Sequence, residues 1–219
     1  MNQKTIEEVD RTFKSINQAI WIVTTAEGES KAGLTATWVH QASIDRAHPT
    51  VLLGLAPNHR TCELLLRSGA AILHLLHPHQ SKVALHFARP SSRHFDKFSG
   101  LATRPVPGPA ILPTGVTAET SGESSPLPVL ENCHTALIAQ TITSFDAGDR
   151  IYLLCRITEL LQTSSTPFLR ESDFFATCQP EEIAQLRNDL AADVTVQRPM
   201  LSRWIAALKN RPGSSSPDE

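Results

Sequence analysis

A segment of small and hydroxyl-bearing residues between Gly33 and Ser43 is the first place where this sequence could support binding chemistry. It contains Thr35, Ala36, Thr37, Ala42 and Ser43. A flat aromatic cofactor needs backbone that can come close to its ring, with hydroxyls and amides directed at its polar edge. Small side chains allow that approach. Taken alone, the same composition also fits the edge of a strand with ordinary threonines and serines.

A second segment, Pro57–Thr61, stands at the start of an expected helix. Free N–H groups and the positive end of the helix dipole suit a phosphate there, and Arg60 and Thr61 add a charge and a hydroxyl. The alternative is a capped helix start with a solvent-exposed arginine. Because the two segments lie about 20 residues apart and are joined by one strand, together they suit a mononucleotide cofactor.

Several short motifs then resemble, in order, the flavin reductase-like family of FMN-binding split barrels. They are Ile20–Thr25, Gly33–Thr37, Gln41–Ser43, Arg60–Thr61, Gly69–Leu76, Phe95–Gly100, Leu130–Cys133 and Gly148–Arg150. The resemblance covers about residues 17 to 161. The run Trp38–Ser43 is most similar to the flavin reductase domain fused to some flavodiiron proteins, although this chain has no room for a flavodiiron core.

The resemblance implies a bound FMN, or FAD, and NAD(P)H as a transient co-substrate. The edge of the isoalloxazine ring would be lined by Thr35, Ala36 and Thr37, and that wall would continue with Gln41, Ala42 and Ser43. The strand leading to the phosphate segment would contribute Gly54, Leu55 and Ala56, and the phosphate itself would be held by Arg60 and Thr61. A last contact with the flavin would come from His86 and Phe87.

One position departs from the family pattern. The motif Gly148-Asp149-Arg150 resembles a "G-D-H" turn whose histidine is associated with NAD(P)H binding or hydride transfer. An arginine cannot donate a proton near neutral pH, but it can bind a dinucleotide phosphate. We therefore expect Arg150 to be the residue of this turn that acts in the reaction, as a nucleotide contact.

The resulting hypothesis is an enzyme that passes a hydride from NAD(P)H to bound flavin and on to free flavin, oxygen or a partner protein such as a monooxygenase. The family also implies a homodimer. The alternative is an FMN-binding electron carrier or redox sensor without NAD(P)H turnover, which the substitution at Arg150 favours slightly. A split barrel that binds another ligand, such as haem, is a third and weaker option.

The elements that must position these residues are mostly strands joined by hairpins, which favours an antiparallel, mainly β (α+β) split barrel with flanking helices. Strands are expected at Ala19–Thr25, Lys31–Val39, Thr50–Leu55, Ala70–Leu76, Asn132–Phe145 and Arg150–Leu161, with shorter ones near Leu101–Arg104 and Pro113–Thr117. Helices are expected near Thr5, which would be the N-cap, then from an Asn58 cap to Arg67, and at His79–Phe87, Glu181–Ala191 and Thr195–Lys209.

This pattern predicts four parts: an N-terminal helix (1–16), the split-barrel domain (17–170), a C-terminal helical extension (171–211) and a disordered tail (212–219). The extension could pack on the barrel and lengthen a dimer interface. Alternatively, it could cap the flavin pocket and limit which acceptor enters.

Composition excludes several other classes. The 219 residues carry 20 basic and 22 acidic side chains, with no basic run, so nucleic-acid binding is not expected. A polar N-terminus and the lack of a long apolar stretch predict a cytoplasmic protein without signal peptide or membrane span. The four scattered cysteines are expected to be free thiols. His74, His77 and His79 do not have ligand spacing that converges on a metal, and Cys133 and His134 are neighbours on a strand and so face opposite sides.

Overall fold

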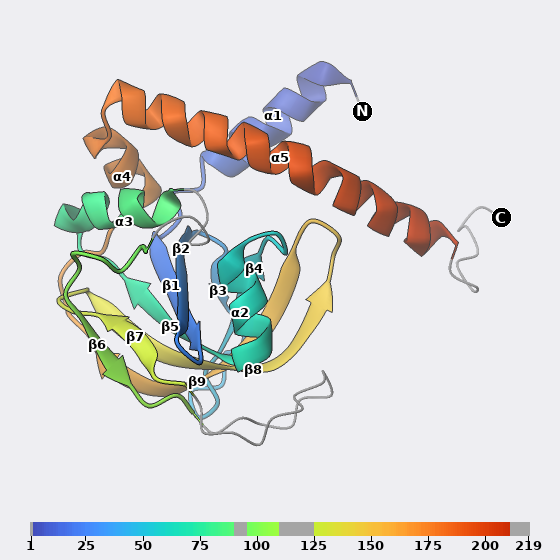
Figure 1. The fold of residues 1–219 in the computed structure, drawn as a ribbon. Coiled ribbons are helices and arrows are strands. Elements are labelled where there is room, and N and C mark those ends of the chain that lie inside the picture. Colours follow the sequence, from blue (N-terminus) through green and yellow to red (C-terminus); the bar gives the residue numbers. More distant parts are fainter. Residues whose placement is uncertain (1, 90–95, 110–124, 211–219) are drawn as a thin grey trace.

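A curled antiparallel sheet of seven strands is the main element of the computed structural model, which describes residues 2–89, 96–109 and 125–210 (Figure 1). The strand order is β2-β1-β5-β8-β9-β4-β3. The strands are β1 (Trp21–Glu27), β2 (Ser30–Ala36), β3 (Val39–Gln41), β4 (Thr50–Leu55), β5 (Ala70–Leu75), β8 (Thr135–Asp146) and β9 (Ile151–Gln162), and a separate pair is formed by β6 (Thr103–Val106) and β7 (Leu127–Leu130). The predicted mainly β fold with flanking helices is confirmed.

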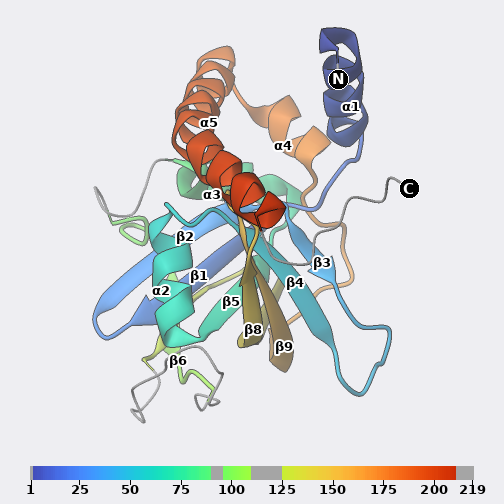
Figure 2. The same ribbon diagram turned by 90° about the vertical axis from the view of Figure 1, so that its right-hand side faces the viewer.

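The helices gather mainly at one end of this half-barrel. They are α1 (Gln3–Lys14), α2 (Arg60–Ser68), η1 (Pro78–Gln80), α3 (Ser81–Ala88), α4 (Glu171–Thr177) and α5 (Pro180–Lys209). Figure 2 shows α1, α4 and α5 above the sheet, with α3 beneath them and α2 alongside the strands. The long α5 runs across the end towards which the β8–β9 hairpin rises (Figure 1).

The core lies on both faces of the sheet. Neighbouring residues in a strand point to opposite faces, so Ile22 and Ile72 enter one buried cluster while Val23 and Leu73 enter another. The first cluster is covered by α3, α4 and the β6–β7 pair, and the second by α2. Because both faces are covered, the central strand β5 is buried along its whole length.

Two helix predictions differ from the structure. The N-cap of α1 is Asn2, whose Oδ1 accepts the Thr5 N–H at 2.9 Å, so the prediction of Thr5 as N-cap is wrong. The two predicted C-terminal helices form one helix, α5, which continues through Asp193. An aspartate in a helix interior usually competes for backbone N–H groups. The side chain of Asp193 is instead bound by residues of the barrel, which removes that competition.

Some predictions fall outside the described residues: the strand near Pro113–Thr117, the disordered tail at 212–219 and the first residue of the Phe95–Gly100 motif. In the part of the chain that the structure describes, no helix has both the length and the apolar character needed to cross a membrane.

Candidate functional site

The tight turn before β9 places Arg150. Gly148 donates its N–H to Asp146 Oδ1 at 2.7 Å, and the Ala147 N–H bonds the Arg150 carbonyl at 2.8 Å. Gly148 has a φ of +89°, which favours glycine. The predicted hairpin turn is therefore present, and it directs Arg150 towards the strand end formed by β4.

The Arg150 side chain is held from several directions. Its guanidinium carbon lies 4.8 Å from the centroid of the Trp38 ring, a cation–π contact. Its Nη1 donates to the Asp149 carbonyl at 2.6 Å and to Gln197 Oε1 at 2.6 Å, and lies 3.4 Å from Asp149 Oδ2. About a fifth of the side chain is exposed (21%), so the group is fixed but accessible.

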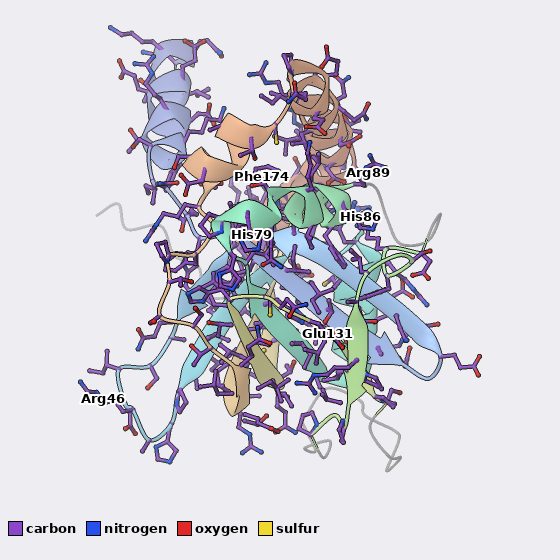
Figure 3. The ribbon with its side chains drawn as sticks, turned by 90° about the vertical axis from the view of Figure 1, so that its left-hand side faces the viewer. Arg46, His79, His86, Arg89, Glu131 and Phe174 are labelled. Carbon is purple, nitrogen blue, oxygen red and sulfur yellow. The ribbon has the colours of Figure 1, made fainter. Side chains whose placement is uncertain are left out.

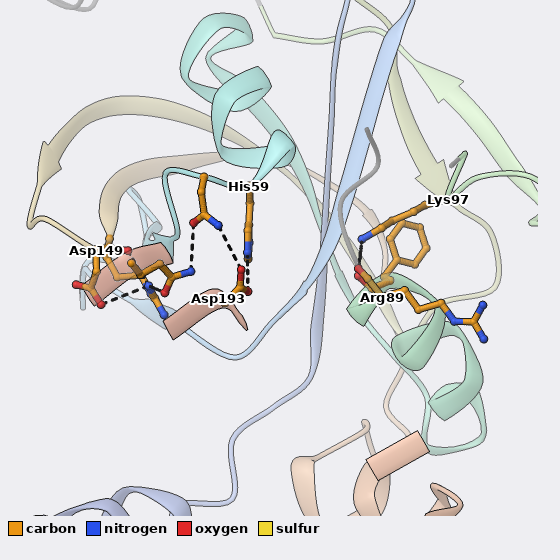
Figure 4. A network of polar contacts seen from close by, with 9 residues as sticks. His59, Arg89, Lys97, Asp149 and Asp193 are labelled. Carbon is orange, nitrogen blue, oxygen red and sulfur yellow. Dashed lines mark hydrogen bonds and ion pairs between the residues drawn. The ribbon is translucent and has the colours of Figure 1, made fainter. Parts of the chain in front are cut away.

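A chain of hydrogen bonds leads from Arg150 to the start of α2 (Figure 4). Gln197 Nε2 donates to Asn58 Oδ1 at 3.2 Å, and Asn58 Nδ2 donates to Asp193 Oδ1 at 3.2 Å. The other Asp193 oxygen lies 2.9 Å from His59 Nε2. Two residues of α5 thus connect the turn that carries Arg150 with the segment predicted to hold a phosphate.

Gly54 provides the surface on which Trp38 rests. The Gly54 N–H donates to the Trp38 carbonyl at 3.0 Å. A side-chain carbon at residue 54 would lie 2.9 Å from Trp38 Cε3 and 3.1 Å from Tyr152 Cε1, closer than carbon atoms normally approach. The absence of a side chain at Gly54 therefore lets the indole lie flat against β4, and it places Thr37, the neighbour of Trp38, beside the same strand.

The start of α2 fits a phosphate in one respect. Its N-cap, His59, makes no side-chain capping bond, so within the described part of the chain the N-cap side chain leaves the first N–H groups of the helix free of a cap. Arg60 lies beside them, but its Nη1 is 2.5 Å from Glu63 Oε1 on the same helix. Thr61 is buried, with 2% of its surface exposed. Asn58, predicted as the cap, directs its side chain to α5 instead, so that prediction is wrong.

The predicted cofactor wall is divided along β4. Thr37 and Trp38 lie beside Gly54, whereas the Ala42 N–H bonds the Thr50 carbonyl at 2.9 Å. Gly54 follows Thr50 by four positions along the strand, a distance of about 13 Å. Gln41, Ala42 and Ser43 therefore lie at the far end of β4; Gln41 Nε2 donates to the Ser43 carbonyl, and Ser43 Oγ accepts the Asp45 N–H.

Other predicted contacts are built into the core. Ala36, Leu55, Ala56 and Phe87 are buried. The Thr35 hydroxyl donates to the Ala84 carbonyl of α3 at 2.6 Å, so it ties β2 to that helix. The Phe87 ring packs against Gly33, where an added side-chain carbon would lie 2.6 Å from it. Thr35, Gly33 and Phe87 thus hold α3 against the sheet, whereas Ala36 and Leu55 belong to the cluster covered by α2.

His86 belongs to a separate polar group at the end of α3, where Figure 3 labels it near Arg89. His86 Nε2 lies 2.8 Å from the Lys97 carbonyl. The Lys97 ammonium donates to the carbonyls of Phe87 and Arg89, both at 2.9 Å, and so satisfies the carboxyl end of the helix. Burial lowers the pKa of Lys97 to about 8.

Sequence reasoning missed three participants in the site. Gln197 and Asp193 lie far along the chain in a helix with no motif, and nothing in their spacing indicated contact with the barrel. Trp38 was visible only as part of a motif. A single aromatic residue there has no signature of its own, because its role depends on Arg150 reaching it.

The histidine and cysteine motifs are structural. His74 is fully buried between strands: Nδ1 lies 3.1 Å from the Ile22 carbonyl, and Nε2 accepts the Leu130 N–H at 3.0 Å. Burial lowers the pKa of His74 to about 4. His134 Nε2 lies 2.7 Å from the Thr166 carbonyl, so it is engaged away from Cys133. Within residues 2–89, 96–109 and 125–210 no cluster of side chains could hold a metal ion.

Comparison with known proteins identifies the class. The family model described as "Flavin reductase like domain" matches residues 13–171. The chain therefore belongs to the flavin reductase-like domain family, a class of enzymes, and the family predicted from the sequence motifs is confirmed. None of the curated proteins compared with this chain matches it.

Solved structures share the fold. An NADH:FAD oxidoreductase of Streptomyces globisporus, in complex with NAD and FAD fragments, is 19% identical with a TM-score of 0.60, over 78% of this chain and 90% of that one. A homologue of nitrilotriacetate monooxygenase component B from Mycobacterium thermoresistibile is 17% identical with a TM-score of 0.57, over 81% and 90% of the two chains. The flavin reductase component of a bacterial two-component tryptophan halogenase is 20% identical with a TM-score of 0.56, over 75% and 92%.

Proposed function

We propose that this protein is an NAD(P)H-dependent flavin reductase with FMN, or FAD, as its flavin. Bound flavin would supply the redox chemistry, accepting a hydride from NAD(P)H and passing electrons to free flavin, oxygen or a partner protein such as a monooxygenase. The first N–H groups of α2, with Arg60, would hold the flavin phosphate. Thr37, next to Trp38, would meet the ring edge, and Arg150 would bind a phosphate of the dinucleotide.

The observation that carries this proposal is the hydrogen-bonded path from Arg150 through Gln197 to Asn58. It places the arginine proposed for the dinucleotide beside the helix start proposed for the flavin phosphate. Two phosphate-bearing ligands that must stack for hydride transfer need two neighbouring anion sites. An arginine and an uncapped helix N-terminus are suitable groups for that purpose.

The first experiment is the visible spectrum of the purified protein after incubation with FMN or FAD, followed by NADH or NADPH without oxygen. A yellow protein that loses its absorbance near 450 nm within seconds of nucleotide addition supports the proposal. A protein that retains neither flavin after gel filtration, and does not reduce added flavin, contradicts it.

A carrier or sensor without NAD(P)H turnover is the second candidate. It is favoured by the position of α5, which packs against the turn that carries Arg150 and leaves about a fifth of that side chain exposed (21%). Under this alternative the flavin would bind but stay oxidised with both nucleotides. A chemical reductant would still bleach it, which separates the two candidates in the same cuvette.

We also propose a cytoplasmic homodimer. Helix α1 supports this part of the proposal, because Ile6, Val9 and Phe13 lie on it at helical spacing and are exposed, Phe13 by 68%. A second copy of the chain would cover this face. Light scattering coupled to gel filtration measures the mass directly, and replacing Phe13 by Glu should convert a dimer into a monomer if this face is the interface.

A further inference from the structure

Helix α5 lies beyond the residues that the family model matches, yet its backbone packs directly on the turn that carries Arg150. A side-chain carbon added at Gly148 would lie 2.9 Å from Leu201 Cα and 2.8 Å from Trp204 Cβ. Helix and turn are thus in direct contact at Gly148. The position of α5 and the position of Arg150 are therefore coupled.

Gln197 is the residue of α5 that makes this coupling specific. It is 5% exposed, whereas the rest of the helix is at most partly buried. A buried amide is costly unless both of its ends are bonded. Both ends are: Oε1 accepts from Arg150 and Nε2 donates to Asn58. The geometry around Gln197 consequently fixes the rotation and register of α5 on the barrel.

The same contact fixes one edge of the Arg150 guanidinium. Among the described residues, its hydrogen bonds to Asp149 and Gln197 are all made by Nη1. The guanidinium carbon lies over Trp38, which sets the position of the plane. The opposite edge, formed by Nε and Nη2, is the one that can donate two parallel bonds to a phosphate.

We propose that Gln197 is a positioning residue for the nicotinamide nucleotide: it holds Arg150 over Trp38 so that the Nε–Nη2 edge meets a phosphate of NAD(P)H. This inference rests on the proposed function. Fixing a flexible arginine before the ligand arrives lowers the entropy cost of binding. The extension beyond the family domain would thereby become part of the nucleotide site.

The competing explanation is that α5 blocks the nucleotide site and does not support it. Asp193 places a carboxylate on Asn58 and His59 at the start of α2. If α5 had to leave before nucleotide could bind, weakening its contacts would improve binding. The test must therefore distinguish a loss from a gain of affinity.

The decisive variant is Gln197→Met, which keeps the side-chain length and removes both hydrogen bonds. We expect the KM for NADPH or NADH to rise about tenfold, the loss expected for one hydrogen bond to a charged group, with kcat within about twofold. Gln185→Met, on an exposed turn of the same helix, is the matched control.

A KM that stays unchanged in Gln197→Met overturns the proposal, and a KM that falls shows that α5 competes with the nucleotide. The variant Arg150→Met separates this failure from that of the proposed function. If Arg150→Met raises KM and Gln197→Met does not, only the positioning role is wrong. If neither variant changes KM, the nucleotide role of Arg150 is wrong as well.

A second readout needs no flavin or nucleotide. In ¹⁵N NMR, hindered rotation of the Arg150 guanidinium should give resolved Nη signals in the wild type, assigned by their loss in Arg150→Met. We expect these signals to merge in Gln197→Met and to persist in Gln185→Met. Equally resolved signals in wild type and Gln197→Met would overturn the positioning role, whatever the enzyme reduces.

Discussion

The guanidinium of Arg150 lies over the indole of Trp38, with 4.8 Å between the Arg150 Cζ atom and the ring centroid. The two residues come from separate hairpins and meet because β4 and β9 are neighbours, with Gly54 opposite Tyr152. Gly54 leaves room for the indole on one side of β4, and the turn at Gly148 delivers the arginine. The position of Arg150 thus depends on two glycines as well as on its direct partners.

Replacing Trp38 by Leu should raise the KM for NAD(P)H about two- to fivefold, since a cation–π contact at a partly exposed site contributes about 0.5–1 kcal/mol. The measurement is steady-state kinetics with flavin at saturation. Trp38→Phe keeps an aromatic face under the guanidinium and should lose less. If the leucine and phenylalanine variants have equal KM values, the ring does not hold Arg150.

Replacing Arg60 by Ala should weaken FMN binding about tenfold, because a charge-assisted bond to the phosphate is lost. Glu63 keeps a second partner in Arg67, at 3.2 Å, so the variant does not leave that carboxylate without a cation. Fluorescence titration gives the dissociation constant.

Riboflavin, which has no phosphate, is the internal control for this variant. Its affinity should be the same in the wild type and in Arg60→Ala. Arg67→Ala, at the other end of α2, should leave both ligands unaffected. An equal loss for FMN and riboflavin would show that Arg60 supports the fold of the site and not the phosphate.

Gly148 and Gly28 form a matched pair for testing the docking of α5. Both have positive φ, +89° and +57°, so alanine strains the backbone at either position, by about 1–2 kcal/mol. Of the two positions, only Gly148 brings an added carbon against α5, since among the described residues nothing lies within 4 Å at Gly28. Gly148→Ala should therefore lower the thermal midpoint more and increase hydrogen exchange along α5.

Equal effects of the two alanine variants would mean that α5 does not pack tightly on the turn. The exchange experiment also locates the change, because only Gly148→Ala should expose amides of the helix. Far-UV circular dichroism shows whether α5 remains helical after it separates from the barrel.

The strands were predictable because their signals are local. β4 has the predicted bounds, Thr50–Leu55, where a β-branched, apolar run follows His48-Pro49. The boundary of β1 differed by two residues, since pairing with Lys31 and Ser30 extends it through Glu27. Alternation of side chains and hairpin turns specifies such elements without reference to distant parts of the chain.

The candidate site was predictable only in part. Arg150 and the start of α2 were named from motifs, and the structure joins them. What joins them could not be inferred, because Asp193 and Gln197 act through contacts across more than a hundred residues of sequence. Asn58 illustrates the same limit: a local rule assigned its side chain to α2, and a tertiary contact took it to α5.

His74 gives the chain a defined acid sensitivity. Its Nε2 accepts the Leu130 N–H, so the ring must be neutral, and Nδ1–H donates to the Ile22 carbonyl. Burial lowers the pKa of His74 to about 4, below its ordinary value of 6.5. Between these values the unfolded chain binds more protons, so stability falls as pH decreases from 6.5 to 4.

Between pH 7.5 and pH 4.5, the contribution of His74 to the free energy of unfolding should fall by about 2–3 kcal/mol, because each unit of pKa difference corresponds to 1.36 kcal/mol. His74→Gln can keep both bonds, donating through Nε2 and accepting through Oε1, but it does not titrate. Carboxylates add the same pH dependence to both proteins, so the quantity to compare is the difference between their urea-unfolding free energies at each pH. That difference should change by about 2–3 kcal/mol across this range. A constant difference between wild type and His74→Gln would mean that His74 takes up its proton at the same pH in the folded and unfolded chains, and that the bond from Leu130 to its ring does not keep the ring neutral.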